Sequence, residues 1–158
     1  MCHLLCQFPV PGGAIVLMNG GPAATGTREG KEIMADQQAE LDRTVSAFYR
    51  TGRAGARRLS DGGGPFGFDI AVALIVDELI REYGCDAIAE TGCFAGDTTS
   101  YLARRYPSLP VYSCDIDQGC AAFTARRLAG CLNAEVTCED SPGMRPGSLP
   151  AMHGRWPS

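Results

Sequence analysis

The sequence predicts an α/β fold, in which a Rossmann-like parallel sheet has helices flanking it. Three short apolar runs, at 86–90, 111–115 and 135–138, are separated by stretches with helical spacing. Strands that alternate with helices form parallel βαβ units with right-handed crossovers, and we expect the sheet to be doubly wound. The length of 158 residues is that of one domain.

Two helices are expected ahead of the first strand. Over 35–50 apolar residues recur at every third or fourth position, and the pattern stops at a glycine-rich loop over 52–67. The second helix is expected over 69–83, where a broad apolar stripe faces inward. Asp69 has the residue type of an N-cap, and Gly84 that of a C-terminal stop.

Two more helices are expected between the strands, over 98–106 and 118–132. A proline follows the first, and small and leucine residues share one face of the second. The segments 1–34 and 142–158 contain glycine and proline without apolar periodicity. We therefore expect a disordered or loosely attached N-terminal segment, a domain over 35–141 and an irregular tail.

The composition excludes several classes of function. Hydrophobic residues make up 45% of the chain and charged residues 20%, which permits a packed core. The formal net charge of −4 argues against a protein that neutralises nucleic-acid phosphate or binds a membrane surface through basic residues. No apolar run approaches the ~18 residues that a membrane span needs. We expect neither a nucleic-acid nor a membrane partner.

The eight cysteines are interpreted as reduced thiols. No signal peptide is recognisable at the N-terminus and no C-x-x-C pair occurs, so a cytoplasmic location is expected. Cys2, His3 and Cys6 are possible zinc ligands. However, no second ligand pair follows at zinc-finger spacing, and we expect no metal site.

The stretch 89–99 (Ala-Glu-Thr-Gly-Cys-Phe-Ala-Gly-Asp-Thr-Thr) joins the first strand to a helix. Gly92 and Gly96 let the backbone approach a ligand, and ligands of open parallel sheets bind at this end of the strands. A phosphate-binding loop would require Gly-Lys-Ser/Thr, and a dinucleotide fingerprint would require glycine where Phe94 stands. Asp97 would also repel a diphosphate. The remaining ligand class has no phosphate but has a ribose and a positive charge.

Acidic residues recur at the same end of the three predicted strands. Glu90 could face an ammonium group, and Asp115 is placed to accept hydrogen bonds from both ribose hydroxyls. Asp140 repeats the pattern after the third strand. S-adenosylmethionine has this set of groups. Taken singly, Asp115 could instead be a helix N-cap and the glycines simple turn residues.

Their neighbours have simpler expected roles. Phe94 is expected to pack under the turn rather than over a ligand. Asp117 is expected to cap a helix or to be a solvated turn residue, and Thr98 and Thr99 to serve the start of the helix.

Three motifs in order resemble those of class I S-adenosylmethionine-dependent methyltransferases. They are Glu90–Thr99, in the variant E-T-G-x-x-x-G-D-T-T, then 111–117 and 138–141. The resemblance covers roughly residues 66–141. It implies the following contacts with the cofactor: Glu90, Gly92 and Gly96 with the methionine part, Asp115 with the ribose, Ile116 beside the adenine, and Asp140 and Ser141 at the adenine edge.

The family's sheet has seven strands, of which this sequence supplies about three, so the resemblance implies an incomplete sheet. Where the family continues into a helix and a fourth strand, this chain has the aperiodic segment that starts at Pro142. Without a fourth strand, the strand at 86–90 would lie at an open edge, and we expect self-association through that edge.

The function expected from the sequence is that of the cofactor-binding half of a methyltransferase, inactive by itself. No Gly-x-Ser-x-Gly or His-Glu-x-x-His motif is present, and no catalytic residue or methyl acceptor is assigned. The alternative is a non-catalytic or partner-dependent nucleoside-binding module. A nicotinamide-dependent oxidoreductase is a more distant third.

Overall fold

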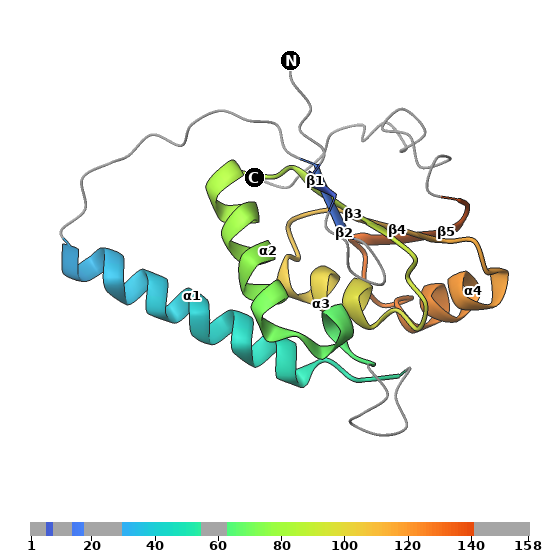
Figure 1. Ribbon diagram of the computed structural model, residues 1–158, viewed down its shortest axis with the longest axis horizontal. Coiled ribbons are helices and arrows are strands. Elements are labelled where there is room, and N and C mark those ends of the chain that lie inside the picture. Colours follow the sequence, from blue (N-terminus) through green and yellow to red (C-terminus); the bar gives the residue numbers. More distant parts are fainter. Residues whose placement is uncertain (1–5, 8–13, 18–29, 55–62, 141–158) are drawn as a thin grey trace, which may run out of the picture.

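A computed structural model describes residues 6–7, 14–17, 30–54 and 63–140, with side chains from residue 35 onward. These residues form a sheet in the order β1-β2-β3-β4-β5, with helices packed beneath it (Figure 1). The strands are β1 (Cys6–Gln7), β2 (Ala14–Leu17), β3 (Ala87–Thr91), β4 (Val111–Asp115) and β5 (Ala134–Cys138). The helices are α1 (Gly30–Arg50), the 3₁₀ helix η2 (Pro65–Phe68), α2 (Ile70–Tyr83), α3 (Asp97–Arg105) and α4 (Gln118–Arg127).

The three strands predicted from the apolar runs form the parallel part of the sheet. β4 pairs in parallel with β3 on one side and with β5 on the other. Because it lies between them, β4 is buried along its whole length. The register places Glu90 opposite Ser113, and Asp115 opposite Cys138. The predicted α/β class, with a partial Rossmann-like sheet and flanking helices, is confirmed.

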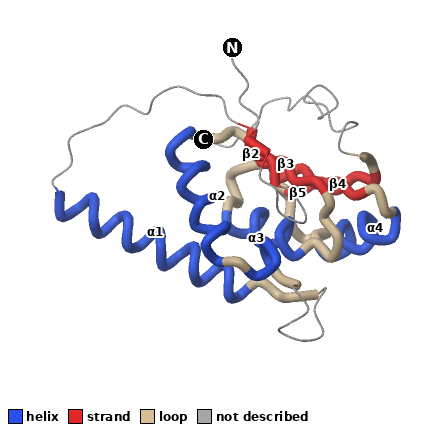
Figure 2. The backbone as a smooth tube through the Cα atoms, in the orientation of Figure 1, coloured by secondary structure: helices blue, strands red, loops and turns tan. Residues whose placement is uncertain are grey.

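The described helices cover one face of the sheet (Figure 2). The chain passes from β3 to β4 to β5 in one direction along the sheet. Two right-handed crossovers in the same direction place α3 and α4 on the same face. A doubly wound sheet would need a reversal of direction, so that expectation is wrong for the described strands.

Two N-terminal strands extend the sheet beyond β3. β2 pairs antiparallel with β3, from Ala14 opposite Glu90 to Leu17 opposite Ala87, and β1 pairs with β2. The expectation that 1–34 is loosely attached is therefore corrected for these strands. A short apolar run shows no periodicity, yet its backbone satisfies the open edge of β3. Since this edge is paired, the argument for self-association through it no longer holds.

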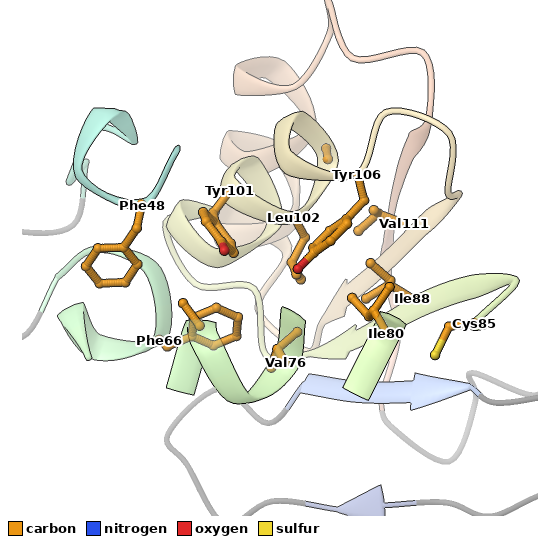
Figure 3. Close-up of a cluster of buried hydrophobic side chains, with 12 residues drawn as sticks. Phe48, Phe66, Val76, Ile80, Cys85, Ile88, Tyr101, Leu102, Tyr106 and Val111 are labelled. Carbon is orange, nitrogen blue, oxygen red and sulfur yellow. The ribbon is translucent and has the colours of Figure 1, made fainter. Parts of the chain in front are cut away.

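The hydrophobic core lies between the helices and one face of the sheet (Figure 3). Ile88 and Val111 are opposite each other in β3 and β4, and both are fully buried. From the helices, Phe48 stacks on Phe68 with ring centroids 5.3 Å apart and meets Tyr101 edge-on at 6.1 Å. This aromatic cluster fixes α1, η2 and α3 against one another.

The helix ends follow the local signals in the sequence, with two exceptions. Asp69 accepts a hydrogen bond of 2.9 Å from the Ala71 N–H, and Gly84 adopts a left-handed φ of 58°, so both predicted caps of α2 are confirmed. The first exception is α1, which begins at Gly30 rather than at residue 35. The second is α4, which ends at Arg127, well before residue 132.

Candidate ligand-binding site

The carboxyl ends of β3 and β4 bring the glycine-containing loop 92–96 together with Asp115. The Gly92 N–H donates to the carbonyl oxygen of Cys114 at 2.8 Å, which docks the loop on the end of β4. Gly92 and Gly96 have φ values of 75° and 70°, a conformation that side chains disfavour. Gly92, Gly96 and Asp115, all predicted from the sequence, thus lie together at the carboxyl ends of the parallel strands.

Asp115 is held in place by backbone groups on both sides. Its Oδ2 accepts a hydrogen bond of 2.8 Å from the Phe94 N–H, and its Oδ1 accepts one of 2.9 Å from the Asp117 N–H. A carboxylate has about four acceptor positions, so capacity remains for two hydroxyl donors. The helix cap is Asp117, which accepts from the Cys120 N–H at 2.8 Å. Asp115 is therefore not the N-cap of α4, and the capping role expected for Asp117 is confirmed.

Two apolar side chains next to Asp115 are exposed. Phe94 is 63% exposed and Ile116 is 81% exposed. The expectation that Phe94 packs under the turn is wrong, because most of the residue is exposed; its backbone has a φ of 46°. A positive φ is uncommon for a bulky residue and is enriched at ligand sites. The carboxylate of Asp115, a residue that is itself only 9% exposed, thus lies beside two exposed apolar side chains.

Glu90 lies beneath this surface and not on it. Only 1% of the residue is exposed, and its Oε2 accepts hydrogen bonds from the Thr99 hydroxyl and, at 2.8 Å, from the Ser113 hydroxyl. Burial raises the pKa of Glu90 to about 7. The carboxyl group therefore joins β3, β4 and α3 internally. Its contact with an ammonium group stays a prediction.

Asp97 has a role that the sequence did not indicate. Its Oδ1 accepts from the Ala54 N–H at 2.9 Å, its Oδ2 accepts from the Gly64 N–H at 2.8 Å, and it pairs with Arg127. The carboxylate is buried and its charge is balanced, so the expected repulsion of a diphosphate loses its basis. The pairs span 30 to 43 positions in sequence, and no local pattern could have identified them.

The two threonines after Asp97 hold different neighbours. The Thr98 hydroxyl accepts from the Phe66 N–H at 2.9 Å and fixes η2 at the start of α3. The Thr99 hydroxyl instead donates to the carboxylate of Glu90. Its side chain therefore does not have the role at the start of the helix that the sequence predicts.

Cys93 is the thiol within the loop. It is 4% exposed, and burial raises its pKa to about 11. At neutral pH the group is therefore a thiol rather than a nucleophilic thiolate. The described cysteines, from Cys85 to Cys138, are free thiols. Within the described part of the chain, no cluster of three or more His, Cys, Asp or Glu side chains could hold a metal ion.

The segment after β5 passes beside the end of β4. The Glu139 N–H donates to the carbonyl oxygen of Asp115 at 3.1 Å. Asp140, the next residue, is exposed. Ser141, the remaining residue of the predicted adenine contact, lies outside the described residues, as does the tail 142–158.

A concave region lies between α1 and α2, away from the strand ends. It is lined by charged residues that include Glu40, Arg43, Glu78 and Arg81. Arg43 pairs with Glu40 and Arg81 with Glu78, each along its own helix. Exposed pairs of this kind contribute little to stability or binding. The residues that line this groove are all charged or polar, whereas the strand ends combine a carboxylate with exposed apolar side chains, so we take the strand ends as the candidate site.

Comparison with known proteins adds no assignment. No family model matches the sequence, and no curated protein matches it at a significant level. Within the described residues, none of the helices has the length and apolar character that crossing a membrane would require. The fold and the site together define an α/β protein with a candidate ligand-binding site at the carboxyl ends of its parallel strands.

Proposed function

We propose that this chain is the cofactor-binding half of a class I S-adenosylmethionine-dependent methyltransferase. The observation that carries the proposal is the carboxylate of Asp115. It is oriented by the Phe94 and Asp117 N–H groups and flanked by the exposed side chains of Phe94 and Ile116.

These residues fit the nucleoside part of the cofactor. The free acceptor positions of Asp115 suit two ribose hydroxyls, which are donors at neighbouring atoms. Ile116 and Phe94 offer apolar surface to a purine ring. The turn at Gly92 would hold the methionine part, because Gly92 has no side chain that blocks backbone approach. At Gly96 the corresponding space is taken by Thr124 of α4.

Catalysis is not assigned to any residue of this chain. The bound cofactor supplies a sulfonium methyl group, and transfer requires an acceptor held in line with it. Glu90, just before the loop, and Cys93, within it, are both buried. This observation favours the alternative function, a nucleoside-binding module that acts with a partner. The cytoplasmic location belongs to the same proposal.

Calorimetry with the full chain and S-adenosylhomocysteine tests the proposal. We expect binding, and we expect Asp115→Asn to weaken it by ~1–3 kcal/mol, the cost of losing hydrogen bonds to a charged acceptor. The matched control is Asp117→Asn, which alters an exposed cap next to the site. NAD and ATP serve as competing nucleotides and should not displace the ligand.

Ribose analogues separate a direct contact from a loop effect. The 2′-deoxy and 3′-deoxy forms of the ligand should bind more weakly to the wild type. They should lose little further affinity in Asp115→Asn, since the contact is already gone. No heat and no competition at millimolar ligand would remove the proposal. Equal losses in both proteins would remove Asp115 as the ribose acceptor.

A further inference from the structure

Two successive carbonyl groups of the loop are bound by one helix. The Thr124 hydroxyl donates to the carbonyl oxygen of Phe94 at 3.1 Å, and Arg127 Nη1 donates to that of Ala95 at 2.7 Å. Thr124 and Arg127 lie one turn apart on α4, so they present donors on the same side. The loop is thus held from α4 by its carbonyl groups and from β4 by the Phe94 N–H.

Arg127 also reaches beyond the loop. Its Nη1 pairs with the carboxylate of Asp97, and its Nη2 donates to the carbonyl oxygen of Gly52 at 2.8 Å. The side chain is 17% exposed, and that of Asp97 is 7% exposed. The planar guanidinium group therefore joins the loop, the start of α3 and the end of the α1 segment. A single ammonium group cannot reproduce this fork of donors.

Gly96 makes this approach of α4 possible. A Cβ atom at position 96 would lie 2.5 Å from Cγ2 of Thr124, closer than real Cβ contacts allow. The absence of a side chain there brings α4 against the loop. The N–H and carbonyl groups of Phe94 belong to consecutive peptide units that share its Cα atom. The hydrogen bond from Thr124 of α4 to the carbonyl oxygen therefore restricts the orientation of the N–H that meets Asp115.

We propose that Arg127 is a positioning residue, which fixes the loop carbonyl groups so that the Phe94 N–H orients the carboxylate of Asp115 for a ligand. The inference deepens the proposed function and rests on it only for the identity of the ligand. Arg127 touches no ligand in this proposal. It acts through the loop, whereas a purely structural ion pair would act through the stability of the whole domain.

The test uses NMR amide exchange on the full chain, with three variants. Arg127→Lys keeps the charge for Asp97 but loses the fork, Thr124→Val removes the hydroxyl donor at nearly constant shape, and Arg126→Gln is the exposed control. Exchange is compared at Phe94 and at Ile88, whose N–H donates to the carbonyl oxygen of Pro110 at 2.9 Å in the core of the sheet.

We expect Arg127→Lys and Thr124→Val to speed exchange at Phe94 by about tenfold, the factor that one net hydrogen bond produces, while Ile88 is unchanged. Affinity for S-adenosylhomocysteine should fall by about the same factor, and Arg126→Gln should alter neither quantity. Exchange that accelerates equally at Phe94 and Ile88 would overturn the inference. Wild-type exchange at Phe94 in Arg127→Lys would overturn it as well. If the wild type binds no ligand, the proposed function fails, and the exchange at Phe94 still decides the role of Arg127.

Discussion

Two arginine–aspartate ion pairs with little solvent exposure connect distant segments of this protein, and they differ in what they fix in place. Arg105 pairs with Asp77 in the helical layer, and Arg127 pairs with Asp97 beneath the candidate site. Both join segments that are far apart in sequence, and both are largely withdrawn from solvent. The difference lies in what else each arginine binds.

The partners of Arg105 are side chains on helices. Its guanidinium group binds Glu40 and Thr44 of α1 as well as Asp77 of α2, and Asp77 also accepts from the Tyr106 hydroxyl at 2.8 Å. The partners of Arg127 are, apart from Asp97, backbone carbonyl groups of loops. The first pair therefore sets how helices pack, and the second sets the shape of a loop. Loss of the first should lower stability, and loss of the second should alter binding.

The largest effect is expected from Asp77→Ala. The variant removes one of the two carboxylates that pair with Arg105, which keeps Glu40, and it leaves the buried Tyr106 hydroxyl without its acceptor. The loss of a buried pair costs up to about 3–5 kcal/mol. Urea denaturation should show this loss, while affinity for S-adenosylhomocysteine, measured on folded protein, should not change. Glu78→Ala, an exposed neighbour on α2, is the control. Weaker binding at unaltered stability would refute the distinction between the two pairs.

Glu90 extends the comparison to a buried acid that pairs with no cation among the described residues. Burial raises the pKa of Glu90 in the folded state to about 7, above its ordinary value of 4.5. The folded state thus holds a proton that the unfolded state releases, so its contribution to stability is complete below the lower pKa and is lost as pH rises through the higher one. The loss over the whole range is roughly 3 kcal/mol.

Urea denaturation across this range tests the point. Glu90→Gln keeps an acceptor for Thr99 and Ser113 but does not titrate, so its stability should depend less on pH than that of the wild type. Glu139→Gln, at an exposed position, should follow the wild-type curve. Parallel curves for the wild type and Glu90→Gln would show that this carboxyl group titrates as it does in the unfolded chain.

A smaller effect is expected from Gly96→Ala on the loop side. The new methyl group meets Thr124, and the residue must keep a φ of 70°, which together cost about 2 kcal/mol. Combining it with Thr124→Ala should recover the part due to overlap and leave the part due to φ. Gly130→Ala is the control, since a Cβ there meets open space. Full recovery in the double variant would show that the backbone angle carries no cost.

The smallest effect is expected from Asp69→Ala in the helical layer. This change removes the side-chain acceptor for the Ala71 N–H at the start of α2, a loss of about 1 kcal/mol for a typical cap. Thermal unfolding measures it, and Asp69→Asn should retain most of the stability. Ligand affinity should stay at the wild-type value. A change in affinity would mean that helix packing and loop shape are coupled.

Most elements of the fold could be predicted because their signals are local. Caps such as Asp69 and Gly84 act on adjacent backbone groups, and the apolar run at 111–115 matches β4 residue for residue. The common edge of Gly92, Gly96 and Asp115 could also be predicted, since parallel strands end on the same side. β2 could not, because four apolar residues acquire a structure only when they meet the backbone of β3.

The sequence by itself determined where the three parallel strands and the helices near them lie, and which end of the sheet carries the glycine turn and the acids. Tertiary structure decided which groups surround each acid. Glu90 and Asp115 both end strands and are 1% and 9% exposed, yet Glu90 accepts from the Thr99 and Ser113 hydroxyls whereas Asp115 accepts from backbone N–H groups of the adjoining loops. Burial and charge pairing depend on side chains that meet across the fold, as Asp97 and Arg127 do. Short-range sequence patterns do not predict such long-range contacts, which form only when the chain packs.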